Sequence, residues 1–325
     1  MPKENKIYDL IIIGAGPAGL TASIYASRYK LSNVLIGKQL GGELSLAHNV
    51  CNFPGFESIS GIEFAEKCKR QVEKLGAEVL LQEVGKIELG KDDKVKFKVY
   101  LKNNSVYYSK SLIIATGSER RRLNIPGEEK YLGRGVSYCT TCDAGFFKDK
   151  TVAIIGGSDA AVTGAIHLSN FASKVYIIYR GDKLRAEPVW LADWQNFEKK
   201  GKGEVFYKTN VKEILGDGTK VTGIKLDVPY KGKETLVLDG VFVEIGGVPG
   251  TSLLKPLGVK LESSGHVVVS EEMETNIPGL FCAGDMTSFS ANFKQAITAA
   301  AQGARAAGSV YKFTKQAQTP RQLGI

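Results

Sequence analysis

The sequence predicts an α/β chain that contains two dinucleotide-binding units, and three observations support this fold class. A chain of 325 residues with 43% hydrophobic content is long enough to bury two cores of ordinary size. A hydrophobic strand, a glycine-rich turn and an apolar helix follow one another near the N-terminus, and the same order recurs from residue 151. The chain has 37 glycines, and many fall in turns where the backbone must bend tightly or touch a ligand.

The first strand, turn and helix lie at the N-terminus. Ile7–Ile13 predicts a buried strand, Gly14–Gly19 matches the pattern G-x-G-x-x-G, and Leu20–Tyr29 has the apolar spacing of a helix. Gly14 permits the tight turn, Gly16 lets the backbone approach a pyrophosphate, and the last glycine allows close packing of the helix. The helix N-terminus adds partial positive charge, so this turn predicts a dinucleotide site.

The second strand of this unit, Val34–Ile36, lacks the acid that usually holds a ribose at this place. The chain continues through Gly37 and Lys38 into a second glycine-rich loop, Gly41–Glu43. We therefore expect ribose recognition to come from this loop.

Two later segments belong to the same unit. Ser111–Ala115 predicts a strand that ends at Thr116 and Gly117, a compact turn through which the chain can enter another domain. Gly279–Asp285 predicts a strand that ends in an acid, and the Ala-rich segment Gln295–Gly308 predicts a helix. An aspartate there can accept a hydrogen bond from a polyol, and the helix N-terminus can stabilise negative charge on a reduced ring.

A cysteine pair lies between the two glycine-rich turns, where Cys139 and Cys142 are separated by two residues and followed by an acid. This spacing predicts a redox-active dithiol or half of a metal site. A zinc site needs two more Cys or His ligands, and the other cysteines and histidines form no second pair, which favours redox chemistry. Cys51, Cys68 and Cys282 are expected to be ordinary buried thiols.

The second turn follows the predicted strand Thr151–Ile155. Gly156–Ala161 opens a helix that is expected to run to about Phe171, and Lys174–Tyr179 is the next strand. Ser158 stands where the pattern has its second glycine, and its side chain crowds the closest approach to a pyrophosphate.

The end of the next strand indicates which ribose this second turn would accept. No acid is present to hold a free 2′-hydroxyl, whereas Arg180 and Arg185 would suit a 2′-phosphate. The candidate NADP residues are Gly156, Ser158, Asp159, Ala160, Arg180 and Arg185. The alternative is a Rossmann-type domain whose nucleotide site has decayed.

Charge and hydropathy bound the remaining possibilities. The net charge is +9, but the lysines are scattered, so the composition does not predict a nucleic-acid partner. The Arg120–Arg122 run is expected on a solvated connection, where it can also attract an acidic protein. The apolar stretch Leu10–Ile13 is too short for a signal peptide or a membrane span, so we expect no membrane partner and a cytoplasmic protein.

With these motifs in order, the chain resembles the low-molecular-weight thioredoxin reductases over nearly its whole length. The order and combination of the motifs are more specific than any one of them. They are Gly14–Gly19, Gly41–Leu44, Asn52–Gly55, Ala115–Gly117, Ser137–Asp143 and Ala283–Asp285.

The resemblance implies that the first turn binds FAD. Glu43, Leu44 and Asn52 would line the flavin, Val84 would meet the adenine through its backbone, and Asp285 would hold the ribitol chain. Gln295 and Ala296 would place backbone groups near the pyrimidine edge. The implied FAD residues are Gly14, Gly16, Pro17, Ala18, Gly41, Gly42, Glu43, Leu44, Asn52, Val84, Ala115, Gly117, Asp285, Gln295 and Ala296. The family usually has Gln in place of Glu43, a change that can alter the flavin potential.

The resemblance also implies the domain plan, in which two three-layer Rossmann-like domains are combined by inserting the second into the first. Residues 1–118 and 249–325 would form the FAD domain, and residues 119–248 the NAD(P)H-binding domain with the dithiol. Thr116–Glu119 and Gly246–Gly250 would act as a hinge for rotation of the smaller domain, and a homodimer is expected.

By family position, Cys142 faces the flavin and Cys139 is the interchange thiol. Cys139 would attack the disulfide of a thioredoxin-like or glutaredoxin-like protein, and Cys142 would resolve the mixed disulfide. Asp143 is placed to act as general acid toward the leaving thiolate.

The electron donor is where the chain departs from the family. Ser158 replaces a glycine, Tyr179 replaces a histidine and Gly181 replaces an arginine; the histidine expected after Ile245-Gly246 is also absent. Three hypotheses follow: an NADPH-dependent thioredoxin reductase, a flavin disulfide reductase with another donor such as a ferredoxin or a deazaflavin, and a redox-sensing flavoprotein that binds a partner without turnover.

Overall fold

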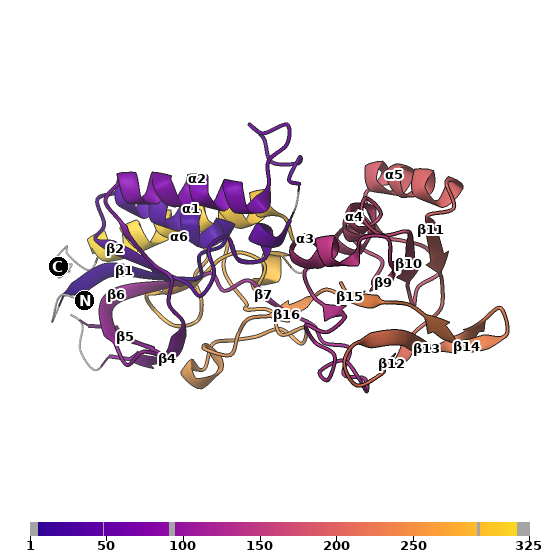
Figure 1. Cartoon of the computed structure of the whole chain (residues 1–325). Helices are drawn as coiled ribbons and strands as arrows, with labels where there is room; N and C mark the ends of the chain where they lie inside the picture. The colour runs from indigo at the N-terminus through magenta and orange to yellow at the C-terminus, as the bar shows by residue number, and fades with distance from the viewer. Residues whose placement is uncertain (1–5, 48, 91–94, 291–292, 317–325) are drawn as a thin grey trace, which may run out of the picture. The chain divides into compact units, whose positions relative to one another are not determined.

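The computed structural model describes residues 6–47, 49–90, 95–290 and 293–316. The chain forms two compact units (Figure 1). Unit 1 comprises Met1–Glu119 with Val248–Ile325, and unit 2 comprises Arg120–Gly247.

Unit 1 is built on a seven-stranded sheet with the order β3-β2-β1-β6-β5-β4, and β17 pairs with β6. Strands β3, β2, β1, β6 and β17 run parallel, whereas β5 and β4 continue the sheet as antiparallel strands. The strands are β1 (Ile7–Ile13), β2 (Asn33–Ile36), β3 (Glu78–Leu80), β4 (Val84–Leu89), β5 (Phe97–Leu101), β6 (Val106–Ile114) and β17 (Leu280–Cys282).

Strand β6 shows how sequence pattern and pairing agree. Its first residues alternate between partly and fully buried where it pairs with antiparallel β5, and Ser111–Ile114 are all buried where it lies between the parallel strands β1 and β17. A parallel sheet covered on both faces requires such a continuous apolar run.

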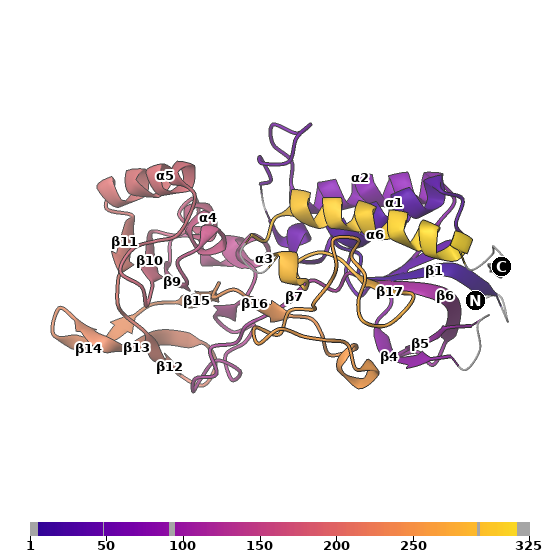
Figure 2. The same ribbon diagram turned by 180° about the vertical axis from the view of Figure 1, so that it is seen from behind.

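Three long helices pack against this sheet, namely α1 (Pro17–Arg28), α2 (Gly61–Lys74) and α6 (Ala296–Gln316) (Figure 2). Helices α1 and α6 approach so closely that a Cβ atom at Gly303 would lie 2.0 Å from the carbonyl oxygen of Ala18. The shorter 3-10 segments are η1 (Gly42–Leu46), η3 (Lys255–Leu257) and η4 (Ser288–Ser290).

Unit 2 has a parallel sheet with the order β11-β10-β9-β15-β8 and a separate antiparallel sheet with the order β12-β13-β14. Its strands are β8 (Val136–Ser137), β9 (Thr151–Ile155), β10 (Lys174–Ile178), β11 (Gly203–Phe206), β12 (Val211–Gly216), β13 (Val221–Tyr230), β14 (Lys233–Val237) and β15 (Gly240–Val243). Its helical segments are α3 (Thr140–Asp143), η2 (Ala144–Phe147), α4 (Asp159–Leu168) and α5 (Pro188–Lys199).

Alternate residues of β9 face two different cores. Val152 and Ile154 pack with the helices around the buried Trp194, whereas Ala153 and Ile155 pack with the antiparallel sheet. Because successive strand residues point to opposite faces, the parallel sheet is the middle of three layers. The predicted α/β class with two Rossmann-like units is confirmed.

Two short strands, β7 (Ser118–Arg120) and β16 (Gly247–Pro249), pair with each other where the chain passes between the units. Helix boundaries differ from the prediction. Helix α1 runs from Pro17 to Arg28, whereas the predicted range was Leu20–Tyr29. Helix α4 ends at Leu168 instead of Phe171, and α6 continues past Gly308 to Gln316 because buried residues such as Val310 and Thr314 extend its apolar face.

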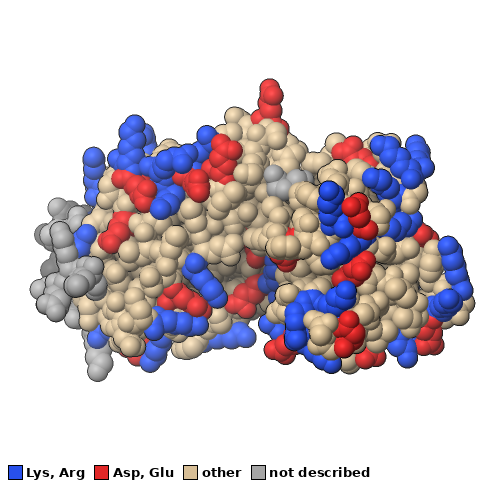
Figure 3. Space-filling view, viewed as in Figure 1, with Lys and Arg blue, Asp and Glu red and all other residues tan. Residues whose placement is uncertain are grey.

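Basic and acidic side chains are interspersed on the face shown in Figure 3. On α2 they form pairs one turn apart, such as Glu63 with Lys67 and Glu66 with Arg70. No helix of the described residues has the length and apolar character needed to cross a membrane.

Candidate redox-active site and nucleotide-binding turns

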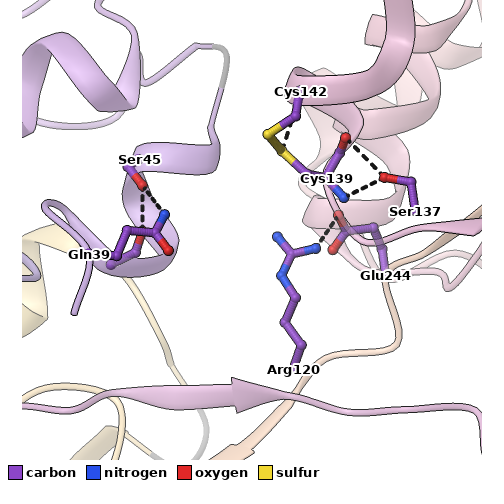
Figure 4. Close-up of a disulfide and its surroundings, with 8 residues drawn as sticks. Gln39, Ser45, Arg120, Ser137, Cys139, Cys142 and Glu244 are labelled. Atoms are coloured by element: carbon purple, nitrogen blue, oxygen red, sulfur yellow. Dashed lines mark hydrogen bonds and ion pairs between the residues drawn. A yellow bond between two sulfur atoms is a disulfide. The ribbon is translucent and has the colours of Figure 1, made fainter. Parts of the chain in front are cut away.

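Cys139 and Cys142 form a disulfide at the start of α3, with their Cα atoms 5.3 Å apart (Figure 4). Cys139 is the N-terminal capping residue of this short helix, and its Sγ accepts a hydrogen bond from the backbone N–H of Cys142 at 3.1 Å. Cys142 is exposed and Cys139 is half-buried. The predicted third residue, Asp143, is half-buried and its N–H donates to the carbonyl oxygen of Cys139.

The backbone leading into the disulfide is fixed on two sides. The hydroxyl of Ser137 accepts the N–H of Cys139 at 2.9 Å, and Ser137 itself lies in β8, paired with β15. Thr140 is buried against α4, where a Cβ atom at Gly164 would lie 3.0 Å from its methyl carbon. The disulfide therefore rests on the parallel sheet and on α4 of its own unit.

Glu128 is a third support, and the sequence reasoning missed it. The residue is 5% exposed, and its carboxylate accepts hydrogen bonds from the N–H groups of Leu123 and Asn124 at 2.8 and 2.7 Å and from the hydroxyl of Tyr138. Burial and this hydrogen bond raise the pKa of Tyr138, which keeps its hydroxyl protonated. A buried carboxylate thus ties the residue before Cys139 to the segment that follows β7.

The first turn, Gly14–Gly19, lies between β1 and α1. Gly14 has a φ of +114°, and a Cβ atom there would lie 2.2 Å from the carbonyl oxygen of Ala115, at the end of β6. Only glycine permits both this conformation and this approach. The structure therefore brings the predicted residues Gly14 and Ala115 together.

Gly16 has a different reason for being small. Its backbone is extended, and the nearest atom to an added Cβ would be the carbonyl oxygen of Gly41, at 3.8 Å. Gly41 is held there because its N–H donates to the carbonyl oxygen of Ala15 at 2.7 Å. The fold thus leaves space beside Gly16 at the N-terminus of α1, which a pyrophosphate requires.

Other predicted residues also gather in unit 1. The amide of Asn52 donates to the side-chain oxygen of Gln295 at 3.1 Å across 243 residues of sequence. Gly117 has a φ of +62° and accepts a hydrogen bond from Gly250. Val84 begins β4, and the preceding Glu83 pairs with Lys38 in the loop after β2.

The remaining predicted flavin residues lie in short helical segments. Gly42, Glu43 and Leu44 form the start of η1, and Ala296 is the first residue of α6. Pro17 and Ala18 form the first turn of α1.

Asp285 follows β17 and is the acid predicted at that strand end. It is half-buried and makes no hydrogen bond to any residue that the structure describes. Burial raises the pKa of its carboxyl group; nearby Lys294 opposes this shift and Glu43 adds to it. A half-buried carboxylate that receives no hydrogen bond from the described residues is suited to accept a hydrogen bond from a hydroxyl group of a ligand.

The second turn, Gly156–Ala161, repeats the first at its first glycine. Gly156 has a φ of +145°, and an added Cβ would lie 2.1 Å from the carbonyl oxygen of Glu244, after β15. Ser158 caps α4 in an extended conformation, and its side chain makes no capping hydrogen bond. Asp159 accepts the N–H of Glu187 at 2.7 Å.

Tyr179 explains two neighbouring glycines. An added Cβ at either Gly157 or Gly181 would lie 2.5 Å from a ring atom of Tyr179. The guanidinium of Arg185 lies 5.9 Å from the centre of this ring, and both Arg185 and Arg180 are exposed beside it. Gly181, which stands where the family has an arginine, is therefore required here by the bulk of Tyr179.

The other cysteines only partly match expectation. Cys282 is buried and Cys68 is half-buried, and burial raises the pKa of both thiols. The prediction that Cys51 is buried was wrong, because it is exposed in a loop just before Asn52. Within the described residues, no group of three His, Cys, Asp or Glu residues could hold a metal ion.

Two Rossmann-like units and a redox-capable disulfide define an oxidoreductase that moves electrons between a dinucleotide and a dithiol. The chain belongs to the pyridine nucleotide-disulphide oxidoreductase family, which it matches over residues 8–303. Within that family it is similar to a thioredoxin reductase of Listeria monocytogenes, with 40% identity over 97% of each chain.

Solved structures of thioredoxin reductases have a similar fold. The Lactococcus lactis thioredoxin reductase in its FR conformation has a TM-score of 0.88 and 35% identity, covering 95% of this chain and 99% of its own. A ferredoxin-flavin thioredoxin reductase of Clostridium acetobutylicum has a TM-score of 0.50 and 33% identity, covering 95% and 98%.

Proposed function

We propose that the chain is a thioredoxin-disulfide reductase, in which electrons pass from NADPH through FAD to the Cys139–Cys142 pair and on to a thioredoxin. The observation that carries this proposal is the Cys139–Cys142 disulfide within a unit that also contains a dinucleotide turn. The similarity to thioredoxin reductases along almost the entire chain supports it.

The residues of the first turn fit FAD. The open space beside Gly16 suits the pyrophosphate, and the Asp285 carboxylate, which receives no hydrogen bond from the described residues, suits the ribitol hydroxyls. Asn52 with Gln295 would lie toward the flavin. FAD, when bound, would supply the two-electron chemistry that links a hydride donor to a disulfide. Unit 1 is therefore the proposed FAD domain, and unit 2 the proposed NADPH domain.

The dithiol chemistry follows from the positions of its atoms. Two-electron reduction opens the Cys139–Cys142 bond, and the N–H of Cys142 is placed to stabilise a thiolate on Cys139. The Cys139 thiolate attacks the partner disulfide and releases one partner thiolate. Cys142 then attacks the mixed disulfide, releases the second partner thiolate and restores the bridge. Asp143 supplies the proton to a leaving thiolate.

The second turn is the proposed NADPH site. Arg180 and Arg185 are exposed beside it and offer positive charge to a 2′-phosphate. Ser158 places a side chain where the pyrophosphate would approach the backbone, which weakens binding relative to a glycine.

A second candidate is a disulfide reductase that receives electrons from another donor, such as a ferredoxin or a deazaflavin. Ser158 and the Tyr179 ring packed on Gly157 favour it, and so does the similarity to a protein described as a ferredoxin-flavin thioredoxin reductase. A redox-sensing flavoprotein without turnover is the third, and sustained thioredoxin reduction would eliminate it.

The finer details of the proposal come from the resemblance. We place the protein in the cytoplasm, as a homodimer, with rotation of unit 2 during each cycle about the hinge Thr116–Glu119 and Gly246–Gly250, where β7 pairs with β16. A glutaredoxin-like protein is the alternative partner.

Anaerobic stopped-flow measurement of flavin bleaching tests the donor. We expect NADPH to bleach the flavin faster than NADH, and a thioredoxin added afterwards to be reduced in the wild type but not in Cys139→Ser. If both nucleotides fail while dithionite-reduced enzyme still reduces thioredoxin, reduced ferredoxin and reduced deazaflavin are tried next, and the NADPH proposal is wrong.

A further inference from the structure

Gln302 in α6 makes hydrogen bonds to the loop between Gly284 and Ser290, which follows β17. Its side-chain oxygen accepts the backbone N–H of Gly284 at 2.9 Å and lies 2.8 Å from the hydroxyl of Thr287. Its side-chain nitrogen donates to the hydroxyl of Ser290 at 2.8 Å. All three partners are buried, so each would lack a hydrogen bond if Gln302 were truncated, apart from the second contact of Thr287 to the carbonyl oxygen of Gly284.

The two groups bound by the Gln302 oxygen are the ends of one turn. The N–H of Thr287 donates to the carbonyl oxygen of Gly284 at 3.0 Å, which closes a four-residue turn from Gly284 to Thr287. Gln302 therefore forms hydrogen bonds from α6 to the first and last residues of this turn.

The two central residues of the turn point to different environments. Met286 is fully buried, and its sulfur lies 3.3 Å from the hydroxyl of Thr116. Asp285 is half-buried, and no residue that the structure describes donates a hydrogen bond to its carboxylate. Since none of the described residues hydrogen-bonds to this carboxylate, its position depends on the backbone of the turn and on what holds the turn.

Helix α6 is a rigid base for this contact. A Cβ atom at Gly303, the neighbour of Gln302, would lie 2.0 Å from the carbonyl oxygen of Ala18, so this part of α6 sits directly on the first turn of α1. The Gln302 side chain therefore fixes the position of the Asp285 turn relative to Gly14–Gly19, the turn proposed to hold the pyrophosphate.

We propose that Gln302 is a positioning residue for cofactor binding: it fixes the Gly284–Thr287 turn so that the Asp285 carboxylate meets the ribitol hydroxyls of FAD. The proposal rests on the proposed FAD site. Gln302 does not touch the cofactor, and it acts through the turn alone.

The test is the affinity of FAD for the apoprotein, measured by quenching of flavin fluorescence, alongside the melting temperature of each apoprotein. Gln302→Ala removes both hydrogen bonds to the turn and is expected to weaken FAD binding about tenfold to a hundredfold. Thr287→Val removes only the hydrogen bond of the Thr287 hydroxyl and is expected to weaken FAD binding less, by about threefold to tenfold.

Two matched variants serve as controls. Thr287→Ser keeps the hydroxyl, and Ser290→Ala removes only the contact outside the turn, so both are expected to bind FAD as the wild type does. If folded Gln302→Ala and Thr287→Val bind FAD like the wild type, or if Ser290→Ala weakens binding as much as Gln302→Ala, the inference is overturned. Should Gln302→Ala not fold, the comparison of Thr287→Val with Thr287→Ser decides. Failure of wild-type apoprotein to bind FAD would instead count against the proposed function.

Discussion

The two glycine-rich turns occupy equivalent places in their units and differ in what surrounds them. Each begins with a positive-φ glycine packed on a carbonyl oxygen, that of Ala115 for Gly14 and that of Glu244 for Gly156. The next position differs. In unit 1 the backbone N and the Cβ of Ala15 face Gly37, whereas in unit 2 Gly157 faces the ring of Tyr179.

This difference is an exchange of volume between two facing positions. The residue in the turn and the residue after the second strand share one space, so a larger side chain on one requires glycine on the other. The fold constrains the first glycine of each turn and the combined volume of the two facing residues. The third position of the turn, Gly16 or Ser158, is expected to affect ligand binding and not folding.

The shared requirement gives the largest expected effect. Gly14→Ala and Gly156→Ala each introduce a Cβ within 2.2 Å of a carbonyl oxygen at positive φ. Each is expected to lower the free energy of unfolding by about 3 kcal/mol or more, measured by urea denaturation. Gly55→Ala and Gly232→Ala are controls with positive φ and open space, and should cost only about 1 kcal/mol. Equal losses in all four variants would contradict the role of the carbonyl contact.

The exchange of volume can be broken in unit 2. Gly157→Ala places a Cβ 2.5 Å from the Tyr179 ring and is expected to cost about 2 kcal/mol of stability. In a Tyr179→Ala background the same change should cost about 1 kcal/mol less, because the ring is gone. A double-mutant cycle measured by denaturation gives the coupling, and additive effects would mean that the two sites do not share one space.

The third position separates binding from folding in unit 1. Gly16→Ser makes the first turn resemble the second, and its Cβ has no neighbour closer than 3.8 Å. We expect the apoprotein to melt like the wild type but to bind FAD about tenfold more weakly, since the side chain enters the space of the pyrophosphate. Fluorescence titration with FAD measures this, and unchanged affinity would place the pyrophosphate elsewhere.

The reverse change sharpens the comparison in unit 2. Ser158→Gly is expected to lower the dissociation constant for NADPH about threefold. The melting temperature should fall only slightly, because a glycine at this position is more flexible in the unfolded chain. Equilibrium titration of the oxidised enzyme with NADPH is the measurement. If the affinity does not change while Arg185→Ala also has no effect, the second turn does not bind the nucleotide.

The smallest effect concerns the acids at the strand ends. Because the pKa of Asp285 is raised, the stability linked to its carboxyl group is present below the ordinary aspartate pKa and is lost as pH rises through the folded-state value. Asp285→Asn should therefore raise the melting temperature of the apoprotein by about 1 °C at neutral pH while weakening FAD binding. Glu244→Gln should instead lower the melting temperature of the apoprotein, because it removes the ion pair of Glu244 with Arg120 at 3.3 Å.

Much of this arrangement could be predicted from local sequence. The strands β1 and β9 have the predicted bounds because their apolar runs are continuous and end in glycine. The dithiol was predicted from the spacing of Cys139 and Cys142 together with the lack of a second pair of Cys or His ligands. Helix ends were less accurate, as with α6, because a glycine inside a helix with a buried face does not end it.

What could not be predicted were contacts between residues far apart in sequence. Nothing local marks Glu128 as buried, and Gln302 lies in an Ala-rich helix where a glutamine is expected to be exposed. The sequence places Tyr179 two residues before Gly181, although only the structure shows that its ring faces both Gly157 and Gly181. The exposure of Cys51 depends on a loop whose path local sequence does not set.

The interrupted course of unit 1 also has a consequence for the order of folding during synthesis. Unit 2 is continuous, and the contacts of Glu128 near the dithiol span at most 10 residues, so their loops close at little entropic cost. Unit 1 lacks β17 and α6 until the last part of the chain has left the ribosome. The dithiol loop can therefore be fully assembled while Asp285 and Gln302 are still to be made.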